Sequence, residues 1–290
     1  PNTNHTGLYV AKEKGYFEKE GLDVEIVQPP EDGADALVAS GKAQFGVSFQ
    51  DSMAPGVAGD NALPNTAVAA LIQHNTSGII SRKGEGMERP KGLEGKKYAT
   101  WDAPIEKAMM QNVVEKDGGD FSKVELIPST VTDEVSALKS KSVDAIWIFY
   151  AWAGVATEVA DLETDYFAFK DINPVFDYYT PVVIANNDFL EEKPDTAKAF
   201  LRALKQGYED AIADPDEAAS ILLEASPELD EELVKASQEY LKDQYKADVK
   251  QWGYIDPARW NAFYGWLNEN GLSEAELPEN AGFSNDYLPE

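Results

Sequence analysis

The sequence contains no cysteine among its 290 residues, so disulfides, thiolate metal sites and cysteine nucleophiles are excluded. Histidine is nearly absent as well, because His5 and His74 are too few for a metal site built from several imidazoles. No apolar run approaches the ~20 residues that a membrane-spanning helix needs, and no signal peptide is visible. These absences predict a soluble chain, or one from which a targeting segment has been removed.

Positive charge is also scarce. The chain has 25 Lys and Arg against 52 Asp and Glu, which gives a net charge of −27. This charge opposes binding to nucleic acids and anionic membranes, and it favours solubility outside a cell. The hydrophobic fraction of 43% supports sizeable cores, and 290 residues are too many for one ordinary core. We therefore expect a chain of two lobes that binds no nucleic acid.

Motifs that carry catalysis are missing too. The sequence has no Gly-x-Ser-x-Gly nucleophile turn and no Gly-x-x-x-x-Gly-Lys phosphate loop. The segment 214–217, Asp-Pro-Asp-Glu, lacks the ligand spacing and the glycine of a calcium loop and is typical of a helix start. The sequence therefore predicts no catalytic residues, no metal and no cofactor.

A repeat is visible when the chain is shifted by one hundred residues. Residues 22–27 (LDVEIV) then fall on 122–127 (SKVELI), and residues 40–49 fall on 140–149. Each half shows short β-branched or aromatic runs alternating with segments of helical spacing. The repeat predicts two similar α/β lobes. Chance similarity is the alternative, since α/β sequences share this rhythm.

The elements predicted from these patterns define an α/β fold in which helices flank a mostly parallel sheet in each lobe. Strands are predicted near 22–27, 44–49, 66–73, 78–82, 96–101, 123–127, 143–149, 165–169 and 180–185. Helices are predicted over 5–18, 32–40, 51–59, 103–117, 131–140 and 152–160, and after residue 187 helix follows helix, separated by Asp-Pro and Ser-Pro turns.

The lobes are predicted to be 1–83 with 181–290, and 84–180. Two extended crossings between the lobes predict a two-strand hinge, with the ligand cleft between the lobes. The repeat also bears on the first residues of the sequence. If the predicted strand 97–101 is shifted back by one hundred residues, the corresponding strand of the first half would end at Pro1. We therefore expect that the first strand is missing and that residues 2–5 form the loop after it. Parallel sheets bind ligands beyond the carboxyl ends of their strands, so this loop is a candidate site.

Five segments carry a resemblance to a known family: TNHTGLYVAKEKGYFEKEGLDVEIV, ALVASGKAQFGVSFQDS, LEGKKYATW, VDAIWIFYAWAG and YYTPVVIANNDFLEEKPDTAKAFLRAL. They resemble substrate-binding proteins of ATP-driven importers, and in particular the thiamine-pyrimidine subfamily, whose members bind hydroxymethylpyrimidine or its formylamino precursor. The resemblance implies a type II periplasmic-binding-protein-like fold and a small-molecule ligand captured by cleft closure. It also implies a monomer with a membrane permease as partner, and an extracytoplasmic location, anchored through a lipidated N-terminal segment.

Two alternatives stay open beside this assignment. The wider superfamily also binds taurine, nitrate and alkanesulfonates, so a sulfonate, nitrate or riboflavin-like ligand is the first alternative. The second is an enzyme, because the eukaryotic pyrimidine synthase of thiamine biosynthesis resembles this chain around His5. That enzyme carries a cysteine-rich segment used with iron, whereas the matching position here reads Phe-Asp-Tyr-Tyr-Thr over 176–180. The missing cysteines argue against the enzyme.

A planar heteroaromatic ligand needs flat apolar faces and a few oriented polar groups. In the first lobe, the candidates are Asn4 and His5 in the opening turn, Gln50 and Asp51 at the end of a strand, and His74 before the first crossing. Amide side chains can both donate to and accept from a pyrimidine edge, and a carboxylate accepts from its exocyclic amine. The alternatives are a helix cap and a surface histidine at the opening, a helix cap at Asp51, and an ordinary turn at His74.

The second lobe offers Trp101 and Glu106 at one strand-to-helix turn, and Tyr150 and Trp152 at another. An aromatic pair just after a buried strand favours stacking on a ligand. A carboxylate in the first turn of a helix is favoured by the helix dipole anyway, so Glu106 has a structural alternative.

The return crossing adds Tyr178, Tyr179 and Thr180 to the candidates. Strand alternation sends the two tyrosines to opposite faces, so one of them is expected to face the ligand.

Overall fold

The computed structural model describes residues 1–30 and 33–289. Their contacts separate into two units. The first contains Pro1–His74 and the described residues from Tyr178 onward, and the second is Asn75–Asp177. Within the described ranges, no helix combines the length and the apolar character needed to cross a membrane.

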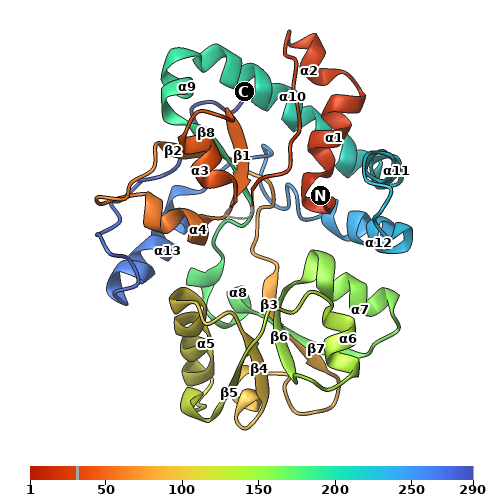
Figure 1. Ribbon diagram of the computed structural model, residues 1–290, viewed down its shortest axis with the longest axis vertical. Helices are drawn as coiled ribbons and strands as arrows, with labels where there is room; N and C mark the ends of the chain where they lie inside the picture. The colour runs from red at the N-terminus through yellow and green to blue at the C-terminus, as the bar shows by residue number, and fades with distance from the viewer. Residues whose placement is uncertain (31–32, 290) are drawn as a thin grey trace. The chain divides into compact units, whose positions relative to one another are not determined.

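The first unit is built on a three-stranded sheet in the order β1-β8-β2 (Figure 1). Both strand pairs are antiparallel, with Ser48 opposite Val182 and Ala70 opposite the same residue of β8. The elements of this unit are η1 (Thr3–His5), α1 (Thr6–Glu13), α2 (Tyr16–Lys19), α3 (Ala34–Ala39), β1 (Phe45–Ser48), α4 (Gln50–Met53), η2 (Ala54–Gly56), β2 (Asn65–Ala70), β8 (Val182–Asn186), α9 (Asn187–Glu192), α10 (Pro194–Ala213), α11 (Pro215–Ala225), α12 (Glu231–Leu241) and α13 (Pro257–Glu269).

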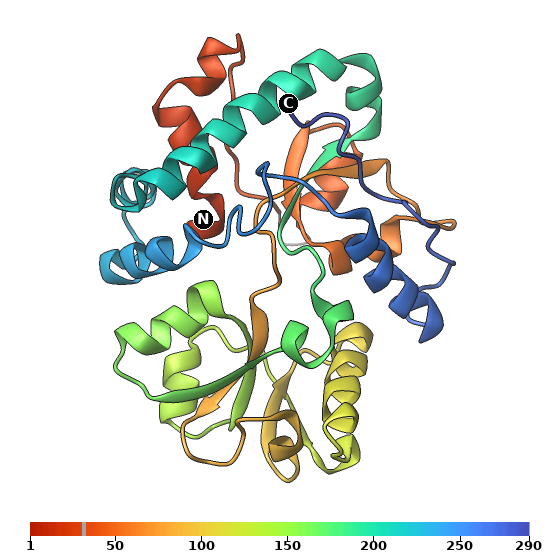
Figure 2. The ribbon, with the colours of Figure 1, turned by 180° about the vertical axis from the view of Figure 1, so that it is seen from behind.

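The long helix α10 crosses this unit and covers both α1 and the sheet (Figures 1 and 2). Phe200 of α10 stacks on Phe45 of β1, with ring centroids 3.9 Å apart, and on Phe17 of α2 at 5.2 Å. Helices α1 and α10 approach closely at two glycines. A Cβ on Gly7 would lie 2.3 Å from the ring of Tyr208, and one on Gly207 would lie 2.0 Å from the carbonyl oxygen of Gly7. The close packing of α1 therefore requires both glycines.

The Asp-Pro turns predicted between the later helices are confirmed. Asp214 caps α11 by accepting from the amide of Glu217, and Pro215 occupies the first helical position. Asp256 caps α13 in the same way, again with a proline next in sequence. An acceptor at the cap and a proline without an amide hydrogen both suit the unpaired donors of a helix start.

The second unit is built on a five-stranded sheet in the order β5-β4-β6-β3-β7. Strands β5, β4, β6 and β7 run in one direction and β3 runs against them. Helix α5 flanks one side of the sheet, and α6 and α7 flank the other (Figures 1 and 2). The elements are β3 (Ser77–Arg82), η3 (Pro90–Leu93), β4 (Lys97–Thr100), α5 (Pro104–Lys116), η4 (Phe121–Lys123), β5 (Glu125–Pro128), α6 (Glu134–Lys139), β6 (Ala145–Phe149), the π-helical turn η5 (Tyr150–Gly154), α7 (Val155–Val159), β7 (Thr164–Ala168), α8 (Phe169–Ile172) and η6 (Pro174–Phe176).

The α/β class agrees with the structure, and the repeat of one hundred residues is seen at one of its two matched segments, 40–49 on 140–149, but not at 22–27 on 122–127. Helix α3 spans 34–39 and α6 spans 134–139, and β1 and β6 start at 45 and 145. The predicted helix over 32–40 begins at a residue outside the described ranges.

Three predicted features are wrong. Residues 22–30 form neither helix nor strand, so the strand at 22–27 is absent. The sheets are mixed rather than mostly parallel, since β8 and β3 each run against both of their neighbours. Residues 75–83 lie in the second unit rather than the first lobe, because β3 pairs with β6 and β7. At the other boundary, residues 178–180 lie in the first unit rather than in the second lobe, where they were predicted.

Candidate functional site

One edge of the first sheet collects most of the candidates in that unit. Strands β1 and β2 end at this edge and β8 begins there, because β8 runs antiparallel to both. The amide of Gln50 donates to the carbonyl of Tyr179 at 3.0 Å, and the amide of Leu71 donates to the carbonyl of Pro181 at 3.1 Å. Three segments far apart in sequence therefore meet here, and they carry Gln50, Asp51, His74, Tyr178, Tyr179 and Thr180.

Gln50 is fully buried, and its side chain bonds within the first unit. Nε2 donates to the carbonyl of Trp260 at 2.9 Å, and Oε1 accepts from the amide of Tyr179 at 2.9 Å. Its own carbonyl accepts from the hydroxyl of Tyr264 at 2.8 Å. The amide group of Gln50 thus joins the end of β1 to the start of β8 and to α13.

Tyr178, Tyr179 and Thr180 are all buried in this structure. The ring of Tyr178 stacks on Phe263 at 4.1 Å. The hydroxyl of Tyr179 accepts from the amide of Asp256 at 2.8 Å and from Nη1 of Arg259 at 3.0 Å. Neither tyrosine ring is exposed, and both pack against α13 and the segment just before it.

Asp51 brings a titratable carboxyl group to the same edge. Burial raises the pKa of Asp51, while hydrogen bonds from its own amide, from the amide of Ser52 and from the hydroxyl of Tyr178 oppose that rise. Asp51 is half-buried, so its carboxylate can still accept a hydrogen bond from a ligand amine.

His74 ends the segment that follows β2. Its Nε2 lies 2.9 Å from Oδ1 of Asp248. This contact with His74 is the main cause that lowers the pKa of Asp248. The imidazole therefore bonds to an exposed carboxylate of its own unit.

The opening turn is held from beneath by two buried tyrosines. The hydroxyl of Tyr208 donates to the carbonyl of Asn4, and that of Tyr245 donates to the carbonyl of Thr3, each at 2.5 Å. Asn2, rather than Asn4, caps the turn, by accepting from the amide of Asn4 at 3.0 Å. The side-chain amide of Asn4 makes no hydrogen bond to any residue that the structure describes, so it can serve a ligand.

His5 is fixed in one tautomer by the same turn. Its Nδ1 accepts from the amide of Asn2 at 3.1 Å. Burial lowers the pKa of His5 to about 4. The ring is therefore neutral at neutral pH, with its proton on Nε2, where it can donate.

The candidates of the second unit also lie beyond one sheet edge. Strands β4 and β6 are parallel neighbours, with Ala99 opposite Ile146, so the residues that follow both strands leave the sheet at the same edge. Trp101 follows β4, and Tyr150 and Trp152 follow β6. This carboxyl edge is where open α/β sheets bind ligands.

Trp101 is the most accessible candidate. Half of its surface, 50%, is exposed, and its ring lies 5.5 Å from that of the buried Trp147. Glu106 is only 3% exposed, and its carboxylate accepts a hydrogen bond from the amide of Trp101 at 3.1 Å. Both residues were predicted from the sequence, but the hydrogen bond by which Glu106 holds the backbone of Trp101 was not.

Tyr150 and Trp152 lie in the π-helical turn η5. Such turns are rare and are frequent at functional sites. The hydroxyl of Tyr150 donates to Glu158, and its ring contacts that of Tyr166 at 4.8 Å, so this residue is tied into the unit. Trp152 is half-buried, and its indole has no hydrogen bond or ring contact among the described residues. Trp152 is therefore the more available ring of the two.

One aromatic residue at the edge of the first sheet was not among the predicted site residues. Phe49 lies between β1 and α4, directly before Gln50, and it is 38% exposed. A large apolar side chain at the end of a strand, one residue before a predicted site residue, was the available signal.

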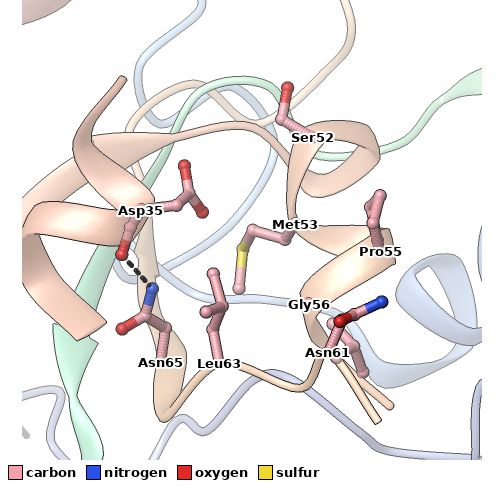
Figure 3. Close-up of a pocket in the computed structure, with 9 residues that line it drawn as sticks. Asp35, Ser52, Met53, Pro55, Gly56, Asn61, Leu63 and Asn65 are labelled. Carbon is pink, nitrogen blue, oxygen red and sulfur yellow. Dashed lines mark hydrogen bonds between the residues drawn. The ribbon is translucent and has the colours of Figure 1, made fainter. Parts of the chain in front are cut away.

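A surface pocket of about 190 Å³ lies in the first unit, beside α4 (Figure 3). Figure 3 shows Met53 and Leu63 in it, and the amide of Asn65 donating to the carbonyl of Asp35 at 2.8 Å. The pocket contains none of the predicted residues, and the Asp35 carboxylate already accepts from Ser48 at 2.7 Å. We therefore do not assign it a ligand.

Among residues 1–30 and 33–289, no group of three or more His, Asp or Glu side chains could hold a metal ion.

Solved structures identify the class of fold. The chain superposes on the periplasmic aliphatic sulphonate binding protein SsuA from Escherichia coli with a TM-score of 0.73, at 14% identity over 95% of this chain and 87% of that chain. The alkanesulfonate-binding protein SsuA from Xanthomonas axonopodis pv. citri gives 0.68, at 13% identity over 99% and 96%. The predicted periplasmic-binding-protein fold is confirmed.

The particular family follows from the sequence comparisons. The pattern of the family described as NMT1/THI5 like matches residues 2–218. The formylaminopyrimidine-binding protein of Halalkalibacterium halodurans is 31% identical, over 98% of this chain and 87% of its own length. The 4-amino-5-hydroxymethyl-2-methylpyrimidine phosphate synthase THI13 of Saccharomyces cerevisiae is 24% identical, over 99% and 85%. The chain belongs to the NMT1/THI5-like family, and the predicted resemblance is confirmed.

Proposed function

We propose that this chain is the extracytoplasmic substrate-binding protein of an ATP-driven importer and that it binds a thiamine-precursor pyrimidine. A relative of 31% identity is named a formylaminopyrimidine-binding protein, and the match covers 98% of this chain. In this proposal the chain hands its ligand to a membrane permease. The observation that carries the proposal is the presence of two accessible indoles, Trp101 and Trp152, beyond one edge of the second sheet.

The chemistry of the candidates fits an aminopyrimidine. Indole rings offer faces for stacking, and such ring pairs contribute about 0.5–1.5 kcal/mol beyond the area they bury. The Asn4 amide can pair with a donor and an acceptor on the ring edge, and Asp51 can accept from the exocyclic amine. Micromolar affinity corresponds to about 8 kcal/mol, which stacking and several hydrogen bonds away from water can supply together.

The ligand is tested by titration calorimetry with purified protein. The titrants are formylaminopyrimidine, hydroxymethylpyrimidine, thiamine, riboflavin, taurine and nitrate. Micromolar or tighter binding of one of the two precursors, with the others at least tenfold weaker, is expected. Preference for riboflavin, taurine or nitrate would replace the pyrimidine assignment while keeping the class of protein.

The platform is tested by truncating the rings. Trp101→Ala and Trp152→Ala are each expected to weaken pyrimidine binding by about 1 kcal/mol or more, because stacking and buried area are lost. Phe121→Ala is the matched control, since Phe121 precedes β5 and so lies at the opposite edge of the same sheet. Unchanged affinity in both tryptophan variants would place the stacking platform elsewhere.

Turnover is the alternative raised by the yeast relatives that are named synthases. Mass spectrometry after prolonged incubation with formylaminopyrimidine separates the two functions. Recovery of the unchanged ligand is expected, and a new pyrimidine product would contradict a purely binding role.

Capture of the ligand by cleft closure, which the sequence led us to expect, is also part of the proposal. X-ray scattering tests it, since saturating ligand should lower the radius of gyration.

A further inference from the structure

The carboxylate of Glu106 has its hydrogen-bonding capacity filled by its own unit. Oε1 accepts from the hydroxyl of Tyr98 at 2.5 Å and from the amide of Trp101 at 3.2 Å. Oε2 accepts from the hydroxyl of Thr100 at 3.1 Å, from the amide of Trp101 at 3.1 Å and from the amide of Ala103 at 3.3 Å. A carboxylate offers about four lone-pair positions, so these contacts leave none for a ligand amine.

The donors all come from β4 and the turn before α5. This turn contains Asp102, a residue other than glycine at φ 60, in the left-handed region. Such a conformation costs on the order of 1 kcal/mol and persists only where neighbouring contacts impose it. The amide of Asp102 donates to the hydroxyl of Thr100 at 2.9 Å, and that hydroxyl donates onward to Glu106. Glu106 is therefore the acceptor on which the whole turn depends.

The result of this arrangement is the position of Trp101. Its ring is half exposed and touches Trp147 on one side, so packing alone does not fix it. Its backbone amide, in contrast, contacts both oxygens of Glu106. A ring whose backbone is fixed in advance loses less freedom when a planar ligand stacks on it.

We propose that Glu106 is a positioning residue, which fixes the turn that presents Trp101 to the ligand and does not itself touch the ligand. The proposal rests on the proposed function, because it assigns Trp101 to a stacking platform. It replaces the direct ligand contact that sequence analysis expected of Glu106.

A double-mutant cycle tests the proposal with Glu106→Gln, Trp101→Ala and the double variant, titrated with formylaminopyrimidine. Glu106→Gln keeps the side-chain volume but turns an amide donor toward the backbone donors. We expect it to weaken binding about 3- to 10-fold, as estimated for the loss of one preordered side chain. In the Trp101→Ala background, the same change should have no further effect. Additive losses would show that Glu106 contacts the ligand and would overturn the proposal.

The control is Asp144→Asn. Asp144 also holds β4, by accepting from the amide of Lys97 at 2.9 Å, but it does so at the other end of the strand. It should lose stability and keep the affinity of the wild type. If Asp144→Asn loses affinity as much as Glu106→Gln, general loosening of the sheet explains both results and the proposal fails.

A second readout does not depend on any ligand. In Glu106→Gln, the backbone amide of Trp101 should exchange its hydrogen at least tenfold faster, as followed by NMR. Should that variant fail to fold, Thr100→Val removes the hydroxyl between Asp102 and Glu106 and should show the same acceleration. Unchanged exchange would overturn the positioning role. If the wild type binds no pyrimidine, the proposed function fails, and exchange at Trp101 still decides this role.

Discussion

Gly207→Ala is predicted to separate helix α1 from helix α10. The new Cβ would lie 2.0 Å from the carbonyl oxygen of Gly7 and 2.9 Å from the Cβ of Ala11. The first of these atoms belongs to the backbone, so no change of rotamer can relieve the contact. Helix α1 must move, and with it the opening turn, which directly precedes this helix and carries Asn4.

The size of the effect follows from two opposing terms. Replacing glycine by alanine inside a helix stabilises the fold by about 0.5–1 kcal/mol. Overpacking of a close contact costs about 1–3 kcal/mol, and a clash with backbone lies at the upper end of that range. Gly207→Ala should therefore lower the free energy of unfolding by about 2–2.5 kcal/mol. It should also weaken pyrimidine binding, because the opening turn is displaced.

Gly265→Ala is the matched control. Gly265 also lies within a helix, α13, and a Cβ there would meet no atom within 4 Å. This variant should gain about 0.5–1 kcal/mol and leave ligand affinity unchanged. Urea denaturation followed by fluorescence, together with calorimetry, measures both quantities. If Gly207→Ala proves as stabilising as Gly265→Ala, then α1 does not require its close approach to α10, and the reasoning is refuted.

Three further predictions concern charge. Because the pKa of His5 is lowered to about 4, the free energy of unfolding should fall by up to about 3 kcal/mol as the pH drops from about 6.5 towards 4. Urea denaturation of His5→Asn should show a smaller fall over this pH range. A fall equal to that of the wild type would contradict the role of His5. The raised pKa of Asp51 has the opposite effect on stability. Ionisation of this carboxyl group should lower the free energy of unfolding as the pH rises above the ordinary pKa of an aspartate. Melts of Asp51→Asn should lack that component, and an unchanged pH profile would exclude it. With a net charge of −27, added sodium chloride should raise the melting temperature at neutral pH by about 2–4 °C for each kcal/mol of screened repulsion, whereas a decrease would show that attractive ion pairs dominate.

Local patterns predicted most elements of the fold, because those patterns act within one element. The alternation that placed strands near 44–49 and 143–149 corresponds to β1 and β6, and the Asp-Pro turns correspond to helix starts. The strand at 22–27 was wrong because β-branched residues favour a strand only where a partner strand is available. Strand direction was not predictable either, since β8 enters the first sheet from more than a hundred residues away in sequence.

The candidate site was likewise predictable only in part from the sequence. Residue type and position at strand ends identified Trp101, Trp152 and Asp51, which lie at the expected edges. The same reasoning also selected Gln50 and Tyr179, whose polar groups bond to each other and to α13. An amide or a tyrosine suited to a ligand is equally suited to a neighbouring backbone, and sequence alone does not show which partner is present.

The C-terminal part of the chain has a consequence for any shortened form of this protein. The family pattern ends at residue 218, yet the tyrosine that holds the carbonyl of Thr3 is Tyr245, and the one that holds the carbonyl of Gln50 is Tyr264. A polypeptide trimmed to the shared pattern would leave these buried carbonyls without donors. Residues beyond 218 therefore complete the hydrogen bonds of the opening turn and of the end of β1.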